Sequence, residues 1–298
     1  MRLLPGIAAL LTACAPAWPG AVLLPPDPAR ASPRFGADGP YGAALWTVMA
    51  LARGQERVPL RIIAPSEGDG ALSGDGPFPA IVLNAGARVA PSRYDWLAAH
   101  LASRGYVVVA PEYGLDLPLP EAGNAQAALR HVEALSDGGG ALSGAVDAGA
   151  PAGILGHSLG GVAAAAVHAE DRQFAALVFL ASYPAGGTDA EGRGAPALSL
   201  CGDEDAFVDR AAVEDGIARY AAGSALGWVE GLNHYGWADA VTDAEAAQEP
   251  APSRLPVDAR IDAQAPLDAW LGLHLGADIS ADAVLRAGAF PGVDWSRP

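Results

Sequence analysis

The chain contains no lysine, only two cysteines and no cluster of basic residues. All 18 of its basic residues are arginines, and 34 acidic residues bring the formal net charge to −16. A chain this acidic lacks the positive surface that binds a phosphate backbone, so we expect no nucleic-acid partner. Because alanine is also abundant, the missing lysine indicates a GC-rich genome and no particular function.

The N-terminus has only a short apolar stretch. Residues 1–13, MRLLPGIAALLTA, carry one arginine and an apolar core too short to span a bilayer, which is typical of a signal peptide. The sequence Leu11-Thr12-Ala13-Cys14 resembles a bacterial lipobox, in which the cysteine is lipidated and becomes the mature N-terminus. The alternative is an ordinary signal peptide cut after Ala15 or Ala17; a cut after Ala15 would leave Pro16 beside the cleaved bond, which is unfavourable.

The rest of the chain divides into a tether and one domain. Residues 14–40 are rich in proline, alanine and glycine and are expected to tether the domain to a membrane. Residues 41–298 are long and apolar enough for one large α/β domain. With Cys14 acylated, Cys201 alone remains, so no disulfide is expected within the mature chain. We expect a lipid-anchored protein of the bacterial cell envelope or, alternatively, a secreted one.

The most informative motif is GHSLGG at residues 156–161. The apolar stretch from Ala152 to Leu155 precedes it and indicates a buried strand, and small residues suited to a tightly packed helix follow it. A serine between strand and helix, flanked by glycines that leave room for the turn, fits the nucleophile-elbow pattern G-x-S-x-G. Ser158 is therefore the candidate nucleophile; the alternative is a plain glycine-rich turn.

A serine nucleophile needs a base, and the base needs an orienting acid. Two further apolar stretches, 197–201 and 226–229, indicate buried strands. Three aspartates follow the first stretch and a histidine follows the second. Open α/β sheets place their sites at the carboxyl ends of the strands, so these side chains are expected to meet the serine there.

These elements resemble the α/β-hydrolase superfamily, and within it the lidless esterases that include bacterial cutinases and polyester hydrolases, chlorophyllase-like enzymes and dienelactone-hydrolase-like proteins. Residues 77–86, PFPAIVLNAG, are similar to the strand before the oxyanion loop, and residues 96–97 and 101–109 to the next helix and strand. The resemblance implies an α/β-hydrolase fold with a mostly parallel central sheet, helices on both faces and no large lid domain. It also implies that the backbone N–H groups of Leu159 and Ala87 form the oxyanion hole.

The resemblance further implies the order nucleophile, acid, base along the chain. Of the six histidines, only His234 and His274 follow the strand that carries the candidate acids. His274 lies in an amphipathic helical stretch, so His234 is the predicted base. The family's G-x-x-D spacing selects Asp205 as the acid, with Asp203 as the alternative, while Asp209 is expected to cap the next helix. The spacing of 47 residues from nucleophile to acid and 29 from acid to base also fits cutinases.

The chain departs from this group in several places. Asn84 and Ala85 stand where a His-Gly pair is often found, and Ala87 stands where polyester hydrolases have an aromatic residue that grips the substrate. Serine replaces the cysteine nucleophile of dienelactone hydrolases, and cutinase-type disulfides cannot form. The departures leave ester chemistry in place and specify no particular ester.

The rim of the site is expected to consist of loops. About fifteen residues separate the expected strand at 175–181 from the next one, which is too few for a helical lid. Tyr183 is either a pocket wall or a turn residue packed on the sheet. Residues 235–265, which contain Trp237, are expected to fold across the entrance.

Other elements follow from local patterns. Alternating apolar residues predict a strand at 58–62, and Pro59 suggests that it lies at the edge of the sheet. Helices are predicted from Ser92, with an S-x-x-D cap, to Gly105, and over 124–135. The acidic turn at 67–76 matches no EF-hand pattern, so no metal site is expected there.

The leading hypothesis is a serine carboxylic-ester hydrolase that acts on a small-molecule or polymeric ester through a Ser-His-Asp triad and an acyl-enzyme intermediate, without metal or cofactor. One alternative is an acyltransferase that uses the same triad to acylate an alcohol or sugar of the envelope. Another is a non-catalytic surface lipoprotein that keeps the hydrolase fold for binding. A complete set of serine, acid and histidine argues against the last.

Overall fold

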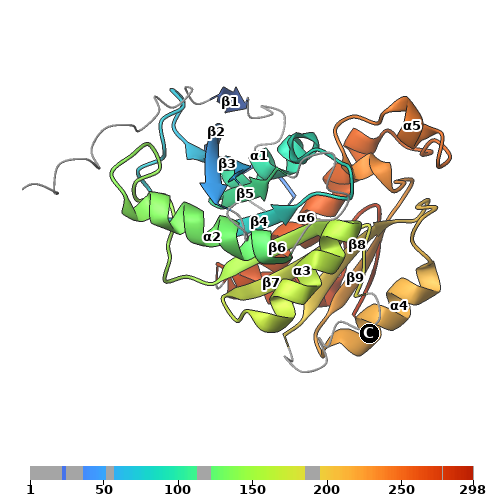
Figure 1. Cartoon of the computed structure of the whole chain (residues 1–298). Coiled ribbons are helices and arrows are strands. Elements are labelled where there is room, and N and C mark those ends of the chain that lie inside the picture. The colour runs from blue at the N-terminus through green and yellow to red at the C-terminus, as the bar shows by residue number, and fades with distance from the viewer. Residues whose placement is uncertain are drawn as a thin grey trace, which may run out of the picture.

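Helices cover both faces of a single large sheet in the computed structural model (Figure 1). The structure describes residues 22–24, 36–51, 57–112, 122–184, 195–276 and 278–297. The predicted signal peptide at 1–13, Cys14 and most of the predicted tether therefore lie outside the described residues.

Ten strands are hydrogen-bonded in the order β1-β2-β3-β5-β4-β6-β7-β8-β9-β10 within the described residues. Their bounds are Val22–Leu24 (β1), Gly42–Leu51 (β2), Arg57–Ser66 (β3), Ala80–Asn84 (β4), Val107–Pro111 (β5), Ala152–His157 (β6), Phe174–Leu180 (β7), Ala197–Gly202 (β8), Ala225–Val229 (β9) and Val293–Ser296 (β10). The pairings from β5 through β4, β6, β7 and β8 to β9 are parallel. The remaining pairings, at the two margins of the sheet, are antiparallel.

The parallel strands are apolar because both of their faces are covered. Every residue of β4, β5, β6, β8 and β9 is buried. Parallel strands between two helical layers carry continuous apolar runs, since neither face meets water. The predicted strands before the elbow, the acid and the base are β6, β8 and β9, so these predictions are confirmed.

The helices divide into two groups according to the face that they cover. Side chains of α1, α6 and α7 join one apolar core, and side chains of α2, α3 and α4 join the other. In the described ranges the α-helices are Asp95–Ser103 (α1), Ala122–Asp137 (α2), Leu159–Glu170 (α3), Arg210–Tyr220 (α4), Asp243–Ala246 (α5), Pro256–His274 (α6) and Ile279–Ala287 (α7). Short 3-10 helices span Pro91–Tyr94 (η2) and Tyr235–Trp237 (η4). Within the described part of the chain, no helix is both long enough and apolar enough to cross a membrane.

The strand predicted at 58–62 forms part of β3, but it does not lie at the sheet edge. β3 pairs with both β2 and β5. Pro59 is tolerated because its missing N–H falls at the end of the ladder with β5, where Leu60 is paired with Pro111. The carbonyl of Pro59 still accepts a hydrogen bond from the N–H of Glu112 at 2.7 Å.

The segment predicted as a tether is partly integrated into the domain. Val22–Leu24 forms β1, which pairs antiparallel with β2. Gly36 donates its N–H to Asp268 Oδ2 at 2.8 Å, and Gly39 donates to Ser103 Oγ at 2.9 Å. The described part of the domain therefore begins before residue 41, the predicted boundary.

The helix expected from Ser92 begins differently. A 3-10 helix comes first, α1 starts at Asp95, and neither has a side-chain cap. The carboxylate of Asp95 instead pairs with Arg61 of β3 at 2.6 Å, so tertiary charge pairing replaces the predicted cap. The helix predicted over 124–135 is confirmed as α2.

Candidate active site

Ser158 occupies a sharp turn between β6 and α3. Its backbone has φ 52° and ψ −124°, which is rare for a residue with a side chain. A Cβ at Gly156 would clash with the carbonyl of Gly160, and a Cβ at Gly160 would clash with the carbonyls of Asn84 and Ala85. The two glycines therefore let α3 begin directly against β6 and the end of β4, and a serine on a sharp turn between strand and helix is the arrangement that the sequence motif predicted.

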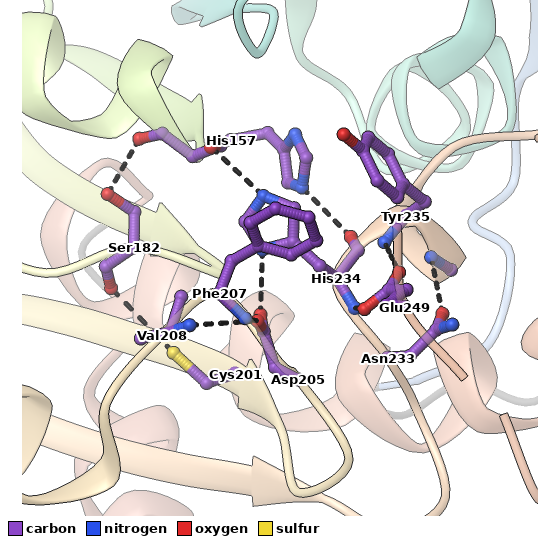
Figure 2. A network of polar contacts seen from close by, with 12 residues as sticks. His157, Ser182, Cys201, Asp205, Phe207, Val208, Asn233, His234, Tyr235 and Glu249 are labelled. Carbon is purple, nitrogen blue, oxygen red and sulfur yellow. Dashed lines mark hydrogen bonds and ion pairs between the residues drawn. The ribbon is translucent and has the colours of Figure 1, made fainter. Parts of the chain in front are cut away.

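The serine, the histidine and one aspartate form a continuous hydrogen-bonded line. His234 Nε2 lies 3.0 Å from Ser158 Oγ. On the other side of the ring, His234 Nδ1 lies 2.8 Å from Asp205 Oδ2 (Figure 2). The side chain of Asp205 is fully buried and that of His234 is 6% exposed. These burials exclude water from the charge pair that forms when the imidazole takes a proton.

The Asp205 carboxylate is fixed by the backbone that follows it. Its Oδ1 accepts hydrogen bonds from the N–H groups of Phe207 at 2.8 Å and Val208 at 3.0 Å. Its Oδ2 is left to face the imidazole. The turn after β8 thereby sets both the position and the direction of the acid.

The other candidate residues have structural contacts. Asp203 Oδ1 accepts the N–H of Gly231 at 2.7 Å and so ties the loop after β9 to the loop after β8. Asp209 accepts the N–H of Ala212 and caps α4, as predicted. His274 lies at the end of α6 with its ring 4.3 Å from that of Trp270.

The two predicted oxyanion donors lie on adjacent segments. Leu159 is the first residue of α3, and N–H groups of a helix's first turn have no partner within the helix. Ala87 follows Gly86 in a turn closed by the Val89 N–H on the Gly86 carbonyl at 3.1 Å. Because Gly160 abuts the carbonyls of Asn84 and Ala85, the start of α3 lies directly beside the predicted oxyanion loop.

A buried carboxylate that sequence reasoning missed holds the loop of His234. Glu249 is 7% exposed, and it accepts the N–H of His234 at 3.0 Å and of Tyr235 at 2.8 Å (Figure 2). Asn233 accepts the N–H of Gly236 at 2.9 Å and donates to the carbonyl of Pro250 at 3.0 Å. No local pattern marks Glu249, because its role depends on the path by which the chain returns after η4.

Two further missed residues, Tyr94 and His157, lie beside the site. Tyr94 Oη is 2.8 Å from His157 Nδ1, and His157 Nε2 is 3.1 Å from the carbonyl of His234. His157 is the second letter of the GHSLGG motif, so its place beside the serine was visible in the sequence. Its contacts were not, since both partners are far away along the chain.

Of the two possible pocket residues, Trp237 packs into the protein, and Tyr183 follows the alternative of a residue packed on the sheet. Trp237 is 1% exposed and its ring belongs to the core that α1 and α6 share, so it cannot meet a substrate directly. Tyr183 is half-buried and packs on the opposite core, where a Cβ at Gly216 of α4 would lie 3.2 Å from its ring. Both are large apolar side chains beside a sheet face, and burial there outweighs exposure at the rim.

The exposed apolar residues beside the triad are different ones. Leu159 is 41% exposed next to Ser158, and Phe207 is 48% exposed with its ring 4.8 Å from that of His234. Tyr235 meets Phe207 edge to face at 5.6 Å. These side chains surround the line of catalytic candidates with apolar surface.

The loop expected to fold across the entrance contains only one short α-helix in its first part, α5. Arg93 binds Glu245 of α5 at 2.7 Å and so holds it against η2. Residues 185–194, where a lid would be inserted after β7, lie outside the described residues. In the part of the chain that is described, no group of three or more His, Cys, Asp or Glu side chains is arranged to hold a metal ion.

Cys201 is not part of the candidate chemistry. It is fully buried at the end of β8, as predicted. Burial raises the pKa of its thiol to about 12, so it stays protonated and unreactive.

Comparison with known proteins agrees with this fold. The model of the alpha/beta hydrolase family matches residues 80–241, which is just over half of the chain and runs from β4 past His234. The chain therefore belongs to the alpha/beta hydrolase family. The comparison with curated protein sequences gives no match.

Proposed function

We propose that the protein is a serine carboxylic-ester hydrolase with Ser158, His234 and Asp205 as its triad. The observation that carries the proposal is the unbroken line of two hydrogen bonds, 3.0 Å and 2.8 Å long, from the hydroxyl through the imidazole to a buried carboxylate. Membership of the alpha/beta hydrolase family supports hydrolysis as the reaction class. Ester specificity rests on the triad geometry and on the lidless-esterase resemblance.

In the proposed reaction Ser158 Oγ attacks the ester carbonyl while His234 Nε2 takes the hydroxyl proton. The resulting imidazolium keeps its Nδ1–H on Asp205, which stabilises the positive charge. The N–H groups of Leu159 and Ala87 receive the negative oxygen of the tetrahedral intermediate. His234 then returns the proton to the departing alcohol, which leaves an acyl-enzyme.

Water completes the cycle. His234 takes a proton from a water molecule, whose oxygen attacks the acyl carbonyl, and then returns that proton to Ser158 Oγ as the acid leaves. No cofactor enters these steps. If another alcohol replaces water, the same residues perform acyl transfer, the alternative that the sequence leaves open.

The exposed side chains beside the triad support an apolar substrate group. Leu159 and Phe207 are both large, apolar and more than two-fifths exposed within a short distance of the nucleophile and the base. Burying such surface under a ligand is favourable by about 25 cal/mol per Å². We propose an ester, small or polymeric, that places its apolar part on these residues.

The location proposed for the enzyme follows from its N-terminus. A lipid-anchored protein of the bacterial cell envelope would meet its substrate beyond the membrane, whereas an ordinary signal peptide would give a secreted esterase. The lipobox-like Leu11-Thr12-Ala13-Cys14 favours the first.

The test uses Ser158→Ala and a panel of chromogenic acyl esters of increasing chain length. Wild-type protein should hydrolyse at least one ester and react with a fluorophosphonate probe at Ser158. The variant should lose both, with kcat/KM more than about a hundredfold lower, because triad loss usually costs far more than that. Analysis of the products with and without added alcohol separates hydrolysis from acyl transfer. If the fluorophosphonate probe failed to react with Ser158, a binding role would be favoured.

A further inference from the structure

A chain of buried hydrogen bonds connects the oxyanion loop to the loop of the base. It runs from the N–H of Gly86 to Tyr94 Oη at 3.3 Å, on to His157 Nδ1 at 2.8 Å, and from His157 Nε2 to the carbonyl of His234 at 3.1 Å. Tyr94 is fully buried and His157 is 1% exposed. Figure 2 shows His157 beside His234 with its contact to the His234 backbone. The predicted oxyanion loop, the turn of Ser158 and the His234 loop thus meet at Tyr94 and His157, two side chains that take no part in the proposed chemistry.

The direction of every hydrogen bond in this chain follows from its ends. The His234 carbonyl can only accept, so His157 Nε2 carries a proton. Burial, together with the adjacent His234, lowers the pKa of His157 well below its ordinary value, so the ring is neutral and Nδ1 is a bare acceptor. Burial also raises the pKa of Tyr94, so the phenol keeps its proton and donates it to Nδ1. The Gly86 N–H, finally, donates to Tyr94 Oη.

The groups along this chain of hydrogen bonds are closely packed. A Cβ at Gly86 would lie 2.6 Å from His157 Nδ1 and 3.4 Å from Tyr94 Oη. The rings of Tyr94 and His157 have their centroids 5.6 Å apart, and those of His157 and His234 lie 4.9 Å apart. We therefore expect a change in either side chain to affect Gly86, the residue before Ala87, and the backbone of His234.

We propose that Tyr94 and His157 are positioning residues that set the oxyanion loop and the His234 loop at their working distances from Ser158. This inference rests on the proposed ester-hydrolase function. Tyr94 acts through His157, and the neutral imidazole with its proton on Nε2 is the form that joins the two loops. An error of about 1 Å in such positions can cost a factor of about 100 in rate.

The first test is Tyr94→Phe, with Tyr106→Phe as its matched control. Both rings are buried in the same core, but Tyr106 takes no part in this chain of hydrogen bonds. Tyr94→Phe should lower kcat roughly 10- to 100-fold with KM within about threefold, and should slow fluorophosphonate labelling to a similar degree. Tyr106→Phe should leave both near wild type. Equal losses in the two variants would overturn the proposal.

The second test asks whether His157 works by hydrogen bonding or only by filling space. His157→Gln can still donate to a carbonyl and accept from a hydroxyl, whereas His157→Leu can do neither. Gln should retain roughly tenfold more activity than Leu, and adding Tyr94→Phe to His157→Leu should cause little further loss, because the two residues share one path. Equal activity of Gln and Leu, or fully additive losses, would contradict the inference.

A spectroscopic measurement separates this inference from the function on which it rests. Nitrogen-15 NMR of the imidazoles in the Ser158→Ala protein should show His157 with a slowly exchanging Nε2–H and an unprotonated Nδ1 at neutral pH, and Tyr94→Phe should shift the Nδ1 signal. A His157 protonated on Nδ1 would overturn the proposed chain whatever the enzyme hydrolyses. An intact NMR signature without any ester turnover would instead show that the proposed function has failed.

Discussion

Ser158 is held in an unfavourable backbone conformation by its neighbours. A residue with a side chain at φ 52° and ψ −124° costs on the order of 1–3 kcal/mol. The Ser158 N–H donates to the carbonyl of Leu180 at 2.9 Å, and the Ser158 carbonyl accepts from Gly161 N at 2.9 Å and Ser182 Oγ at 2.7 Å. These bonds offset the cost and aim the hydroxyl at His234.

Among single residues, Asp205 should dominate the orientation of the base. Asp205→Asn should lower kcat by about 10⁴, because an amide favours the wrong imidazole tautomer. Asp203→Asn should be mild, since that side chain contacts the N–H of Gly231 and not the imidazole. Steady-state kinetics on one chromogenic ester compares the two. A severe loss in Asp203→Asn with near-normal Asp205→Asn would reverse the assignment.

The segment after α5 folds back onto the loop of His234 and helps to fix the position of that loop. Glu249 accepts two consecutive N–H groups of the His234 loop, and only a carboxylate offers two equivalent acceptor oxygens there. The backbone of His234 is thus held in part by a segment that returns from beyond α5.

Glu249→Gln should therefore lower kcat, because the amide nitrogen of Gln must face a backbone N–H and leaves it unsatisfied. An unsatisfied buried donor costs about 1–3 kcal/mol, so we expect a loss of roughly 5- to 100-fold if that cost is felt in the transition state. Glu245→Gln is the control, since Glu245 lies on the same return segment but pairs with Arg93. Kinetics and thermal melts of both variants make the comparison. Unchanged kcat in Glu249→Gln would exclude this role.

Across the whole molecule, His100 joins three separate parts. It lies on α1, its Nδ1 is 3.1 Å from Asp38 in the N-terminal segment, and its Nε2 is 2.9 Å from Asp268 on α6. Burial alone lowers the pKa of His100, but Asp268 and Asp38 outweigh it and raise the pKa to about 9. Arg104, 3.6 Å from Asp268, completes this buried charge cluster.

The charge cluster predicts the pH dependence of stability. Because the folded pKa of about 9 exceeds the unfolded value of 6.5, the stabilisation is fully present below pH 6.5 and is lost as pH rises through 9. A shift of that size corresponds to on the order of 3 kcal/mol. Urea unfolding of wild type and His100→Gln across this range measures it. If the free energy of unfolding changed with pH in the same way for both proteins, the prediction would be contradicted.

The N-terminus is predicted to determine where the molecule works. If Cys14 is lipidated, Cys14→Ser should move the protein from the membrane to the soluble fraction without changing its specific activity. Stable anchoring needs two acyl chains or more, because one gives only marginal binding. Intact-mass analysis of the native protein provides the check. An unmodified N-terminus at Pro16 or Trp18 would show a secreted enzyme instead.

Local patterns in the sequence determined much of this architecture. Apolar runs marked β6, β8 and β9 because parallel strands are buried on both faces, and the glycines around Ser158 marked the elbow because no larger residue fits there. The family's G-x-x-D spacing selected Asp205, and a position just after an apolar strand selected His234; the structure brings both to the serine. Each of these signals lies within a few residues of the feature that it describes.

Only the tertiary structure decided the rest. The joining of β1 to the sheet, the burial of Trp237, the carboxylate of Glu249 under His234 and the contact of Tyr94 with His157 all join residues far apart in the sequence. Glutamate and tyrosine are common on surfaces, and nothing in their immediate neighbours distinguishes these two. Their roles arise because the folded chain brings a buried donor and a buried acceptor together, and unpaired polar groups in the interior are costly.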